Sequence, residues 1–391
     1  MRGIHRLKGV IKQYDWGGTS FIPSLLQQDN AAKKPFAEYW MGVHPLGHAT
    51  IESGDGKWKQ LADVAGKLPY LLKILDVKDM LSIQVHPSKD AAAKEFEREN
   101  AMGIPPDSPA RNYKDDNHKP ELIVALSDFW LLHGFKSPEE LVYTLLNVVE
   151  LRELLPVYNQ SGYGGLYKHV MEMPQEEVNR ILQPLIDNIA EIYKDAEPEK
   201  EDEDFWAARA AKEFCGGGNI DRGIFSIYLF NLIHLQKGQG VFQDTGVPHA
   251  YLEGVCMEIM ANSDNVLRGG LTHKHIDVNE LLKHTRCEAT YVKILEGEEI
   301  NSSEKLYSTP ATDFRLTVIE LKTGESAELN PSGPEILVIT EGIASIRNGQ
   351  ESIELKAGEP SAVLLPGGTV WVKAAAESTV FRASVPVHKG L

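Results

Sequence analysis

The sequence contains little cysteine and no long hydrophobic run. Its three cysteines, Cys215, Cys256 and Cys287, are too few and too scattered for a disulfide framework. No stretch approaches the roughly 18 apolar residues of a transmembrane helix. The first twenty residues carry basic side chains but no apolar segment of the kind found in secretory signals. These absences predict a cytoplasmic protein with reduced thiols and no membrane partner.

Positive charge is also scarce. Lysine and arginine number 40 against 56 aspartates and glutamates, which gives a formal net charge of -16. Nucleic-acid binding depends on basic patches, so this balance excludes nucleic acid as the expected partner. An anionic small molecule would need lysines and arginines gathered locally around its site.

The size and composition indicate an ordinary globular protein of more than one domain. The 391 residues, with 42% hydrophobic and 25% charged side chains, allow two or three domains with a sizeable core. The N-terminal part alternates short strand patterns with turns. A helix is expected over Ser88–Asn100, with Ser88 as its N-cap.

The pattern becomes helical from Lys136 to about Ile233. Ser137 to Glu140 form a capping box with proline at the first helical position. Further helices are expected near Gln175–Lys194 and over Phe205–Phe214. The first of these carries apolar residues on one side, namely Val178, Ile181, Leu182, Leu185 and Ile189. The pattern therefore predicts a helical insertion in a mainly β protein.

Strand patterns return after residue 300. Turn signals separate the expected strands, which are Arg315–Leu321, Glu335–Ile339, Ile343–Arg347, Ala362–Leu365 and Val370–Val372. The only histidine in this part is His388, so it lacks ligands for a metal site of its own. A structural or site-covering role is expected for it.

Three separated stretches carry metal-binding chemistry. Gln84 and His86 are two residues apart and would share one face of a strand, as would Lys119 and Glu121. The third stretch contributes His249, which follows a turn. Taken alone, such a histidine is more often part of a core than a ligand. The four together form a mixed nitrogen and oxygen set that suits a divalent metal such as zinc, namely Gln84, His86, Glu121 and His249.

The same stretches resemble a known family. QVHPSKD, YKDDNHKPE and GVPHAYLEG followed by DNVLRGGLT resemble the three signature stretches of type I mannose-6-phosphate isomerase. QYDWGG at residues 13–18 and LLKIL at residues 71–75 are also similar to that family. The resemblance covers about residues 8–290.

This resemblance implies a zinc-dependent interconversion of mannose 6-phosphate and fructose 6-phosphate on a cupin fold, with one zinc ion per chain. It implies Gln84, His86, Glu121 and His249 as ligands and Arg268 as the active-site arginine. The expected fold comprises jelly-roll barrels of the cupin type, one catalytic and one C-terminal, with an α-helical domain. The expected division is a catalytic domain in two parts (1–135 and 234–300), a helical insertion (136–233) and a C-terminal β domain (301–391).

Aldose–ketose isomerisation through a cis-enediol needs a base and a group that stabilises the developing oxyanion. Glu258 is the candidate base, because burial would raise its pKa. Asp264 and the His118–Lys119 pair compete for this role. Glu258 could instead be a structural partner of Arg268 or Lys274. The predicted catalytic set is Arg268, Glu258, Lys119 and Asp264.

The predicted substrate contacts are Lys73, Ser82, Tyr251, Lys274 and Trp16. Lys73 interrupts an apolar run, so it could bind phosphate or extend to the surface. Trp16 could line the site or pack in a turn.

Two other functions remain open, a non-catalytic cupin that binds sugar phosphates and another metal-dependent cupin enzyme such as an oxygenase. Gln84 speaks against redox iron, and the presence of Lys119, Glu258 and Arg268 speaks against a mere binder. The expected partner is a small sugar phosphate. The sequence leaves the oligomeric state open, and a monomer is compatible with it.

Overall fold

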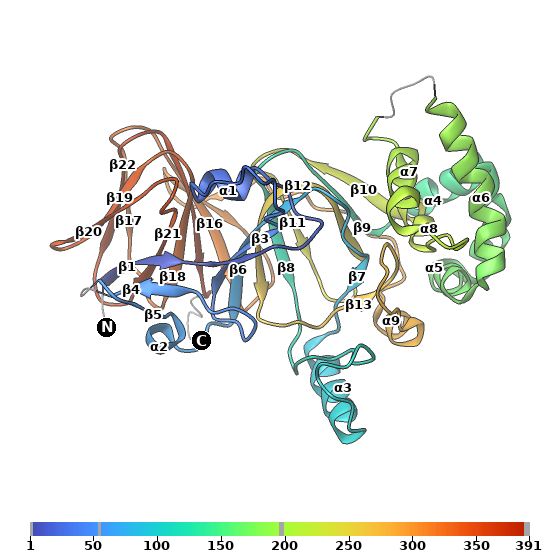
Figure 1. Ribbon diagram of the computed structural model, residues 1–391, viewed down its shortest axis with the longest axis horizontal. Coiled ribbons are helices and arrows are strands. Elements are labelled where there is room, and N and C mark those ends of the chain that lie inside the picture. The colour runs from blue at the N-terminus through green and yellow to red at the C-terminus, as the bar shows by residue number, and fades with distance from the viewer. Residues whose placement is uncertain (1–2, 54–55, 195–198, 387–391) are drawn as a thin grey trace.

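A computed structural model describes residues 3–53, 56–194 and 199–386. The molecule is elongated, with β-sheets over most of its length and a group of helices at one end (Figure 1). The strands described form sheets of nine, ten and four strands. None of the helices in these ranges combines the length and the apolar character needed to cross a membrane.

The nine-stranded sheet joins the two ends of the chain. Strand β1 (Gly3–Lys8) lies between β21 (Ser361–Leu365) and β4 (Thr50–Glu52), antiparallel to both. The other strands are β5 (Trp58–Gln60), β14 (Glu298–Glu299), β15 (Glu304–Tyr307), β16 (Arg315–Leu321), β18 (Glu335–Glu341) and β23 (Ser378–Ser384). This sheet therefore crosses the division between residues 1–135 and 301–391 expected from sequence.

A four-stranded sheet packs on the outer face of the nine-stranded sheet. Side chains alternate along β18, so that Leu337 and Ile339 face this small sheet while Ile336 and Val338 face the opposite core. The small sheet consists of β17 (Ser326–Leu329), β19 (Ala344–Asn348), β20 (Glu351–Leu355) and β22 (Val370–Ala374). The five strands predicted in this part of the chain are confirmed, with ends shifted by up to two residues.

The long strand β12 (His249–Ala261) organises the ten-stranded sheet. Its first half pairs with β7 (Gln84–Val85) and β9 (Phe129–Phe135), and its second half pairs with β6 (Tyr70–Val77) and β8 (Glu121–Ala125). Gly254 lies at the change of partner with φ of 125°. A Cβ there would lie 2.4 Å from the carbonyl oxygen of Asp128, so the bend requires glycine. The remaining strands are β2 (Val10–Lys12), β3 (Glu38–Gly42), β10 (Phe230–Leu235), β11 (Gly240–Gln243) and β13 (Leu267–Arg268).

The alternation of side chains along β12 decides which way the buried Glu258 points. Val255, Met257 and Ile259 belong to the core shared with the nine-stranded sheet, whereas Cys256 belongs to a separate core within the ten-stranded sheet. Glu258 shares the parity of Cys256 and is therefore directed away from the nine-stranded sheet.

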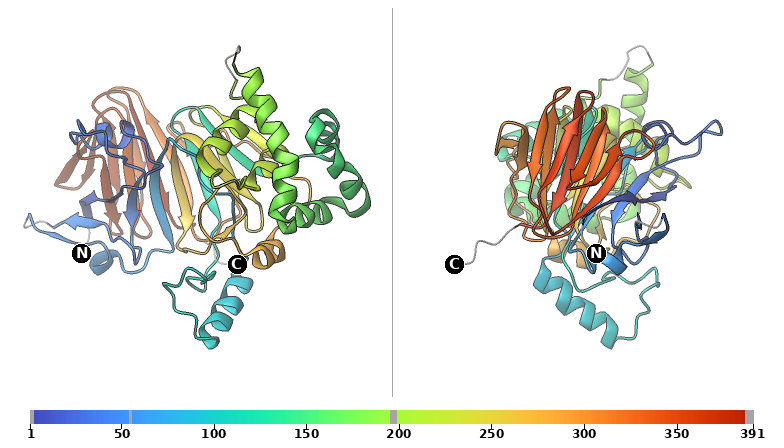
Figure 2. Two further views of the ribbon diagram at one scale, coloured as in Figure 1. Left: turned by 45° about the vertical axis from the view of Figure 1, so that its right-hand side comes forward. Right: turned by 90° about the vertical axis from the view of Figure 1, so that its left-hand side faces the viewer.

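The helices behave largely as their sequences predict. α3 (Lys89–Ala101) begins after Ser88, whose hydroxyl accepts from the Ala91 amide, and α4 (Pro138–Asn147) has the expected capping box. In α6 (Gln175–Ile192) all five apolar residues predicted on one side are buried. Figure 2 shows α4 and α6, within the green group of helices, at one end of the β-sheets, whereas α3 (cyan) projects separately. The others are α1 (Phe21–Leu25), α2 (Ala62–Ala65), η1 (Val149–Leu154), α5 (Leu155–Glu172), α7 (Glu203–Phe214), α8 (Gly223–Leu229) and α9 (Val278–His284).

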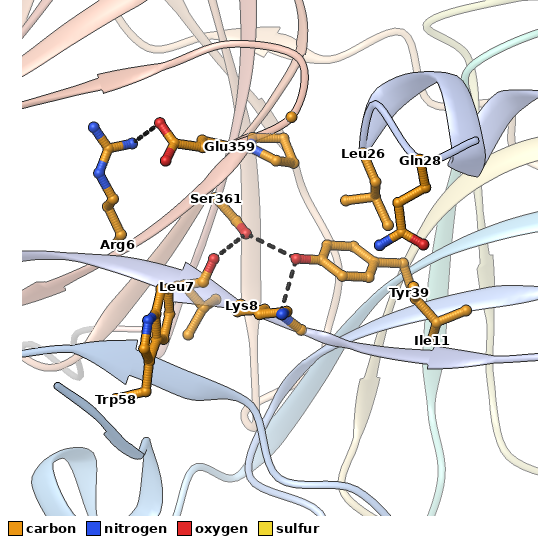
Figure 3. A pocket seen from close by; sticks show the side chains of 13 residues that line it. Arg6, Leu7, Lys8, Ile11, Leu26, Gln28, Tyr39, Trp58, Glu359 and Ser361 are labelled. Carbon is orange, nitrogen blue, oxygen red and sulfur yellow. Dashed lines mark hydrogen bonds and ion pairs between the residues drawn. The ribbon is translucent and has the colours of Figure 1, made fainter.

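A small cavity marks the seam between the N-terminal strands and the C-terminal sheet (Figure 3). Its volume is about 260 Å³. The Tyr39 hydroxyl accepts from the Gly9 amide at 2.8 Å and lies 3.3 Å from the Ser361 hydroxyl, which donates to the Leu7 carbonyl at 2.9 Å. These polar atoms are satisfied by one another, so they tie β1 to β21.

Arg382 on β23 should carry a large share of the stability of the nine-stranded sheet. Its guanidinium binds both carboxylate oxygens of Glu335, at 2.7 and 3.0 Å, and Glu304 at 3.1 Å, and all three side chains are largely buried. Arg382→Met would leave two buried carboxylates without a counter-charge. We expect a loss of about 3–5 kcal/mol in the free energy of unfolding, measured by denaturant titration.

The exposed Arg347 on β19 provides the control, because a surface substitution of this kind usually changes stability by less than about 0.5 kcal/mol. Equal effects of Arg347→Met and Arg382→Met would show that the buried network contributes nothing specific.

Candidate metal centre

Three side chains from distant parts of the sequence meet in the ten-stranded sheet. His86, Glu121 and His249 are all buried, and each offers a ligand atom such that the three atoms lie within 4.8 Å of one another. Nε2 of His249 lies 3.2 Å from Oε2 of Glu121, and Nε2 of His86 lies 3.6 Å from Oε1. Within the described ranges, no other group of three His, Cys, Asp or Glu side chains has such a geometry.

Strand pairing explains why these residues meet. His249 opens β12 and lies opposite Gln84 of β7, with His86 following directly after that strand. Glu121 opens β8, which runs along the other half of β12. Gln84 lines the same small cavity of about 50 Å³ as Glu121 and His249. All four predicted ligands are thus near one another.

Hydrogen bonds leave both histidines in a form suited to metal binding. Nδ1 of His86 lies 2.7 Å from the Asn265 carbonyl oxygen, and Nδ1 of His249 lies 3.0 Å from the Val247 carbonyl oxygen. A carbonyl oxygen only accepts, so each Nδ1 donates to it and each Nε2 is the ring nitrogen left to bind a metal. Nε2 of His86 is buried without a hydrogen-bond partner among the described residues.

The charge state of the cluster also fits a divalent cation. Burial, followed by the positive charge of Lys119, lowers the pKa of His86 to about 4, so its imidazole is neutral. Burial alone would raise the pKa of Glu121, but Lys119 and His86 hold it well below its usual value. Two imidazole nitrogens, one carboxylate and the nearby amide of Gln84 are a donor set that zinc accepts.

Positive and negative side chains alternate around this cavity. Nζ of Lys119 lies 2.8 Å from Oε1 of Glu121, as expected from their shared strand face. The Tyr251 hydroxyl donates to Oε2 of Glu121 at 3.1 Å. Nζ of Lys73 lies 2.9 Å from Oε1 of Glu258. Lys73 is therefore buried in the site and does not extend to the surface.

Glu258 has the properties expected of a base. It is buried and lines the cavity, and burial raises its pKa against the opposing charge of Lys73. Among the described residues its ion-pair partner is Lys73, so the expected alternative of a pair with Arg268 or Lys274 is wrong. The sequence could not reveal this partner, which is 185 residues away.

The predicted residues after β12 lie beside the cluster. Arg268 on β13 is opposite Gln84 in the strand pairing and is half-buried, and burial lowers its pKa. Its guanidinium has no ion-pair partner among the described residues. Oδ2 of Asp264 lies 3.4 Å from Nε2 of His44. Lys274 is exposed, and its pKa is lowered by desolvation and then by the charge of Arg268.

Ser82 and Trp16 are the remaining predicted substrate contacts. Ser82 is half-buried and lines the cavity. Trp16 is partly buried and stacks on Tyr14 with ring centroids 5.9 Å apart. His118, the other candidate base, is mostly buried, and its Nε2 lies 2.9 Å from Oδ2 of Asp313.

Sequence reasoning missed several residues around the cluster. Glu38 lines the cavity, and His133 lies opposite His249 in the strand pairing, hydrogen-bonded to Gln243. Asn265, which is hydrogen-bonded to His86, belongs to the DNVLRGGLT stretch but was not predicted to have a role of its own. Glu38 and His133 sit within apolar strand runs, where the polar residue is itself the signal.

These features define a metal-binding enzyme built mainly on β-sheets with several helices. A family model described as phosphomannose isomerase type I, catalytic domain, matches residues 4–138. Mannose-6-phosphate isomerase of Escherichia coli (strain K12) is 33% identical, over 95% of this chain and 97% of that protein. Mannose-6-phosphate isomerase 2 of Arabidopsis thaliana is 28% identical, over 97% and 92%.

Solved structures agree with this similarity. A crystal structure of mannose 6-phosphate isomerase from Salmonella typhimurium, bound to substrate (f6p) and zinc, has a TM-score of 0.86 and 29% identity, covering 98% of this chain and 100% of that chain. A second structure, bound with zinc and yttrium, has the same TM-score, identity and coverage. The chain belongs to the type I mannose-6-phosphate isomerase family.

Proposed function

We propose that this chain is a metal-dependent aldose–ketose isomerase that interconverts mannose 6-phosphate and fructose 6-phosphate, with one zinc ion per chain. The observation that carries this conclusion is the buried set of His86, Glu121 and His249 in a chain similar along almost its whole length to such isomerases.

Gln84, His86, Glu121 and His249 are the proposed zinc ligands. When bound, zinc supplies a Lewis acid that polarises sugar oxygens and favours an anionic intermediate. With Glu121 as the only anionic ligand, the site keeps a net charge of about +1 by simple addition. A site rich in cysteine would lose that charge, and this chain offers no cysteine there.

Glu258 is the proposed base for the proton transfer. In the open-chain sugar it removes the proton from C2 of mannose 6-phosphate while O1 gains a proton, which gives the cis-enediol. Return of a proton to C1 and loss of the proton on O2 then give fructose 6-phosphate. The burial that raises the pKa of Glu258 makes it a stronger base, and Lys73 fixes its orientation at 2.9 Å.

Three other residues complete the proposed catalytic set. Arg268, without an ion-pair partner among the described residues, is available to stabilise the oxyanion of the enediol. Lys119 assists from the Glu121 face, where it also keeps that carboxylate ionised. Asp264, beside His44, is retained as the alternative base.

The proposed substrate contacts are Lys73, Ser82, Tyr251, Lys274 and Trp16. Lys274 is exposed and close enough to Arg268 to feel its charge, so these two cations can attract a phosphate to an otherwise acidic protein. Ser82 and Tyr251 line the cavity and offer hydroxyls to the sugar.

The fold supports a cupin-type arrangement as a further proposal. The folded ten-stranded sheet would be the catalytic unit, residues 136–233 its helical insertion, and residues 301–391 a C-terminal β unit completed by β1. His86, Glu121 and His249 all lie outside residues 136–233, which supports this division. His388 lies outside the described residues. The net charge of -16 disfavours nucleic acid as a partner, and three free cysteines support a cytoplasmic location.

A coupled assay tests the proposed function. Zinc-loaded protein should convert mannose 6-phosphate to fructose 6-phosphate, detected by a fructose 6-phosphate-consuming enzyme system. Treatment with a chelator followed by its removal should abolish the conversion, and added zinc should restore it, because the metal supplies the Lewis acid.

The alternatives give different results in the same experiment. Binding of the sugar phosphate without turnover by the zinc-loaded protein would indicate a non-catalytic cupin. Restoration of the conversion by iron but not by zinc would replace zinc as the proposed metal. The first outcome would overturn the proposed function, and the second would overturn only its metal.

A further inference from the structure

Asn265 is fully buried between the chain segments that carry the metal ligands. It lies in the turn between β12 and β13, three residues before Arg268. Its backbone carbonyl contacts His86, and its side chain contacts residues 114–117, which lead to Lys119 and Glu121. It thus touches both approaches to the metal cluster.

The backbone of Asn265 determines the state of His86. Its carbonyl oxygen accepts from Nδ1 of His86 at 2.7 Å, which places the proton on Nδ1 and leaves Nε2 as the ligand atom. The Asn265 amide donates to the Ser263 hydroxyl at 3.2 Å, which holds this carbonyl in a fixed turn.

The side chain of Asn265 holds residues 114–117, whereas its backbone holds His86. Its Oδ1 accepts from the Lys114 amide at 2.7 Å and the Asp115 amide at 3.3 Å. Its Nδ2 donates to the Asp115 carbonyl and the Asn117 carbonyl, both at 2.8 Å, and lies 3.2 Å from Oδ1 of Asp115. Every hydrogen-bonding atom of the side chain is used.

Only an amide of this length satisfies these contacts. A carboxylate would direct acceptor oxygens at two carbonyls and at Asp115, and an alanine would leave backbone donors and acceptors buried without partners. The residue type at position 265 is therefore set by both segments at once.

We propose that Asn265 is a positioning residue that links the two metal-binding segments, fixing the His86 ring and the approach to Glu121 before the metal binds. Its side chain is fully buried and engaged by residues 114–117, so it acts through the metal ligands and not directly on the substrate. The inference rests on the proposed metal site, and it adds a residue that sets metal affinity through the geometry of the ligands.

The test compares Asn265→Ala with Asn262→Ala. Asn262 is a partly buried asparagine in the same turn, but its side chain donates to the Val43 and Leu68 carbonyls, which belong to other segments. Zinc affinity is measured by competition with a chromophoric chelator, without substrate, below the melting temperature of each variant. We expect affinity to fall about 10-fold for Asn265→Ala, the lower end of the effect of disturbing a ligand's hydrogen-bond partner, because the backbone carbonyl that holds His86 remains but loses the side-chain contacts that fix it. Asn262→Ala should stay within about twofold of the wild type even where its melting temperature falls.

Asn265→Asp, nearly the same size, provides the second variant should the alanine variant fail to fold. It should also bind zinc more weakly, and saturating zinc should restore activity to both variants in part. Wild-type zinc affinity in whichever of the two variants folds would reduce Asn265 to a structural residue and overturn the proposal. A wild-type protein that binds zinc but does not isomerise the sugar would instead overturn the proposed function and leave this inference standing.

Discussion

Replacing His249 with alanine should remove most of the bound zinc and nearly all isomerase activity. His249 Nε2 lies 3.2 Å from Glu121, and its Nδ1 is held by the Val247 carbonyl, so its lone pair is already oriented toward the cluster. Loss of a ligand should weaken zinc binding by more than the roughly 100-fold that loss of a ligand's hydrogen-bond partner can cause. Metal analysis of the purified variant and the coupled assay measure the two effects on one sample.

Zinc binding also links this prediction to stability. A metal that binds only the folded state raises the unfolding free energy by mass action, about 2.7 kcal/mol at a concentration 100 times its dissociation constant. Added zinc should therefore raise the melting temperature of the wild type and leave that of His249→Ala nearly unchanged. The wild type should contain about one zinc per chain, as a single four-ligand set implies.

His234→Ala is the matched control for this substitution. His234 is a partly exposed histidine on β10 that stacks on Trp130 and lies outside the cluster. It should retain zinc, activity and the zinc-dependent rise in melting temperature. Full activity in a verified metal-free His249→Ala protein would refute the metal site altogether.

Local sequence signals predicted much of the secondary structure. The 3.6-residue spacing from Val178 to Ile189 marked α6, and the Ser137 capping box marked the start of α4. α5 was missed because its sequence contains three glycines and because its helical geometry is interrupted at Gly162, where φ is 61°. Such a helix depends on tertiary packing rather than on a local pattern.

Long-range strand pairing could not be predicted in the same way. Gly3 pairs with Leu365, so β1 completes a sheet whose other strands come largely from the far end of the chain. Nothing in the sequence of residues 3–8 indicates pairing with β21 rather than with a strand close to it in the sequence. The expected division at residue 135 accordingly separates stretches of sequence but does not separate sheets.

The metal ligands could be predicted from the sequence more readily than the ion pairs around them. Alternation along a strand was enough to place Lys119 and Glu121 on one face, and their side chains do form an ion pair at 2.8 Å. The partners of Glu258 and Asp264, Lys73 and His44, depend on which strands lie side by side. Those pairs required the three-dimensional structure.

Arg268→Ala should lower kcat by about a hundredfold or more, the scale for removing one donor to an oxyanion. Arg268 is half-buried beside Gln84, and its guanidinium has no ion-pair partner among the described residues. It is therefore available for charge that develops on the sugar. Loss of a contact made mainly in the transition state lowers kcat, whereas loss of uniform substrate binding mainly raises KM. Steady-state kinetics with mannose 6-phosphate separate the two.

Two controls make this result interpretable. Arg286→Ala removes an exposed arginine that lies 3.1 Å from Asp244, and an exposed pair of this kind contributes little, so kcat should not change. Arg268→Lys keeps the charge but loses the planar fork, and it should recover only part of the rate. Zinc content and melting temperature of Arg268→Ala should stay near the wild type, because the guanidinium holds neither a ligand nor a buried carboxylate. A near-normal kcat with a raised KM would instead place Arg268 at the phosphate, where its charge attracts the substrate but does not act on the reacting carbons.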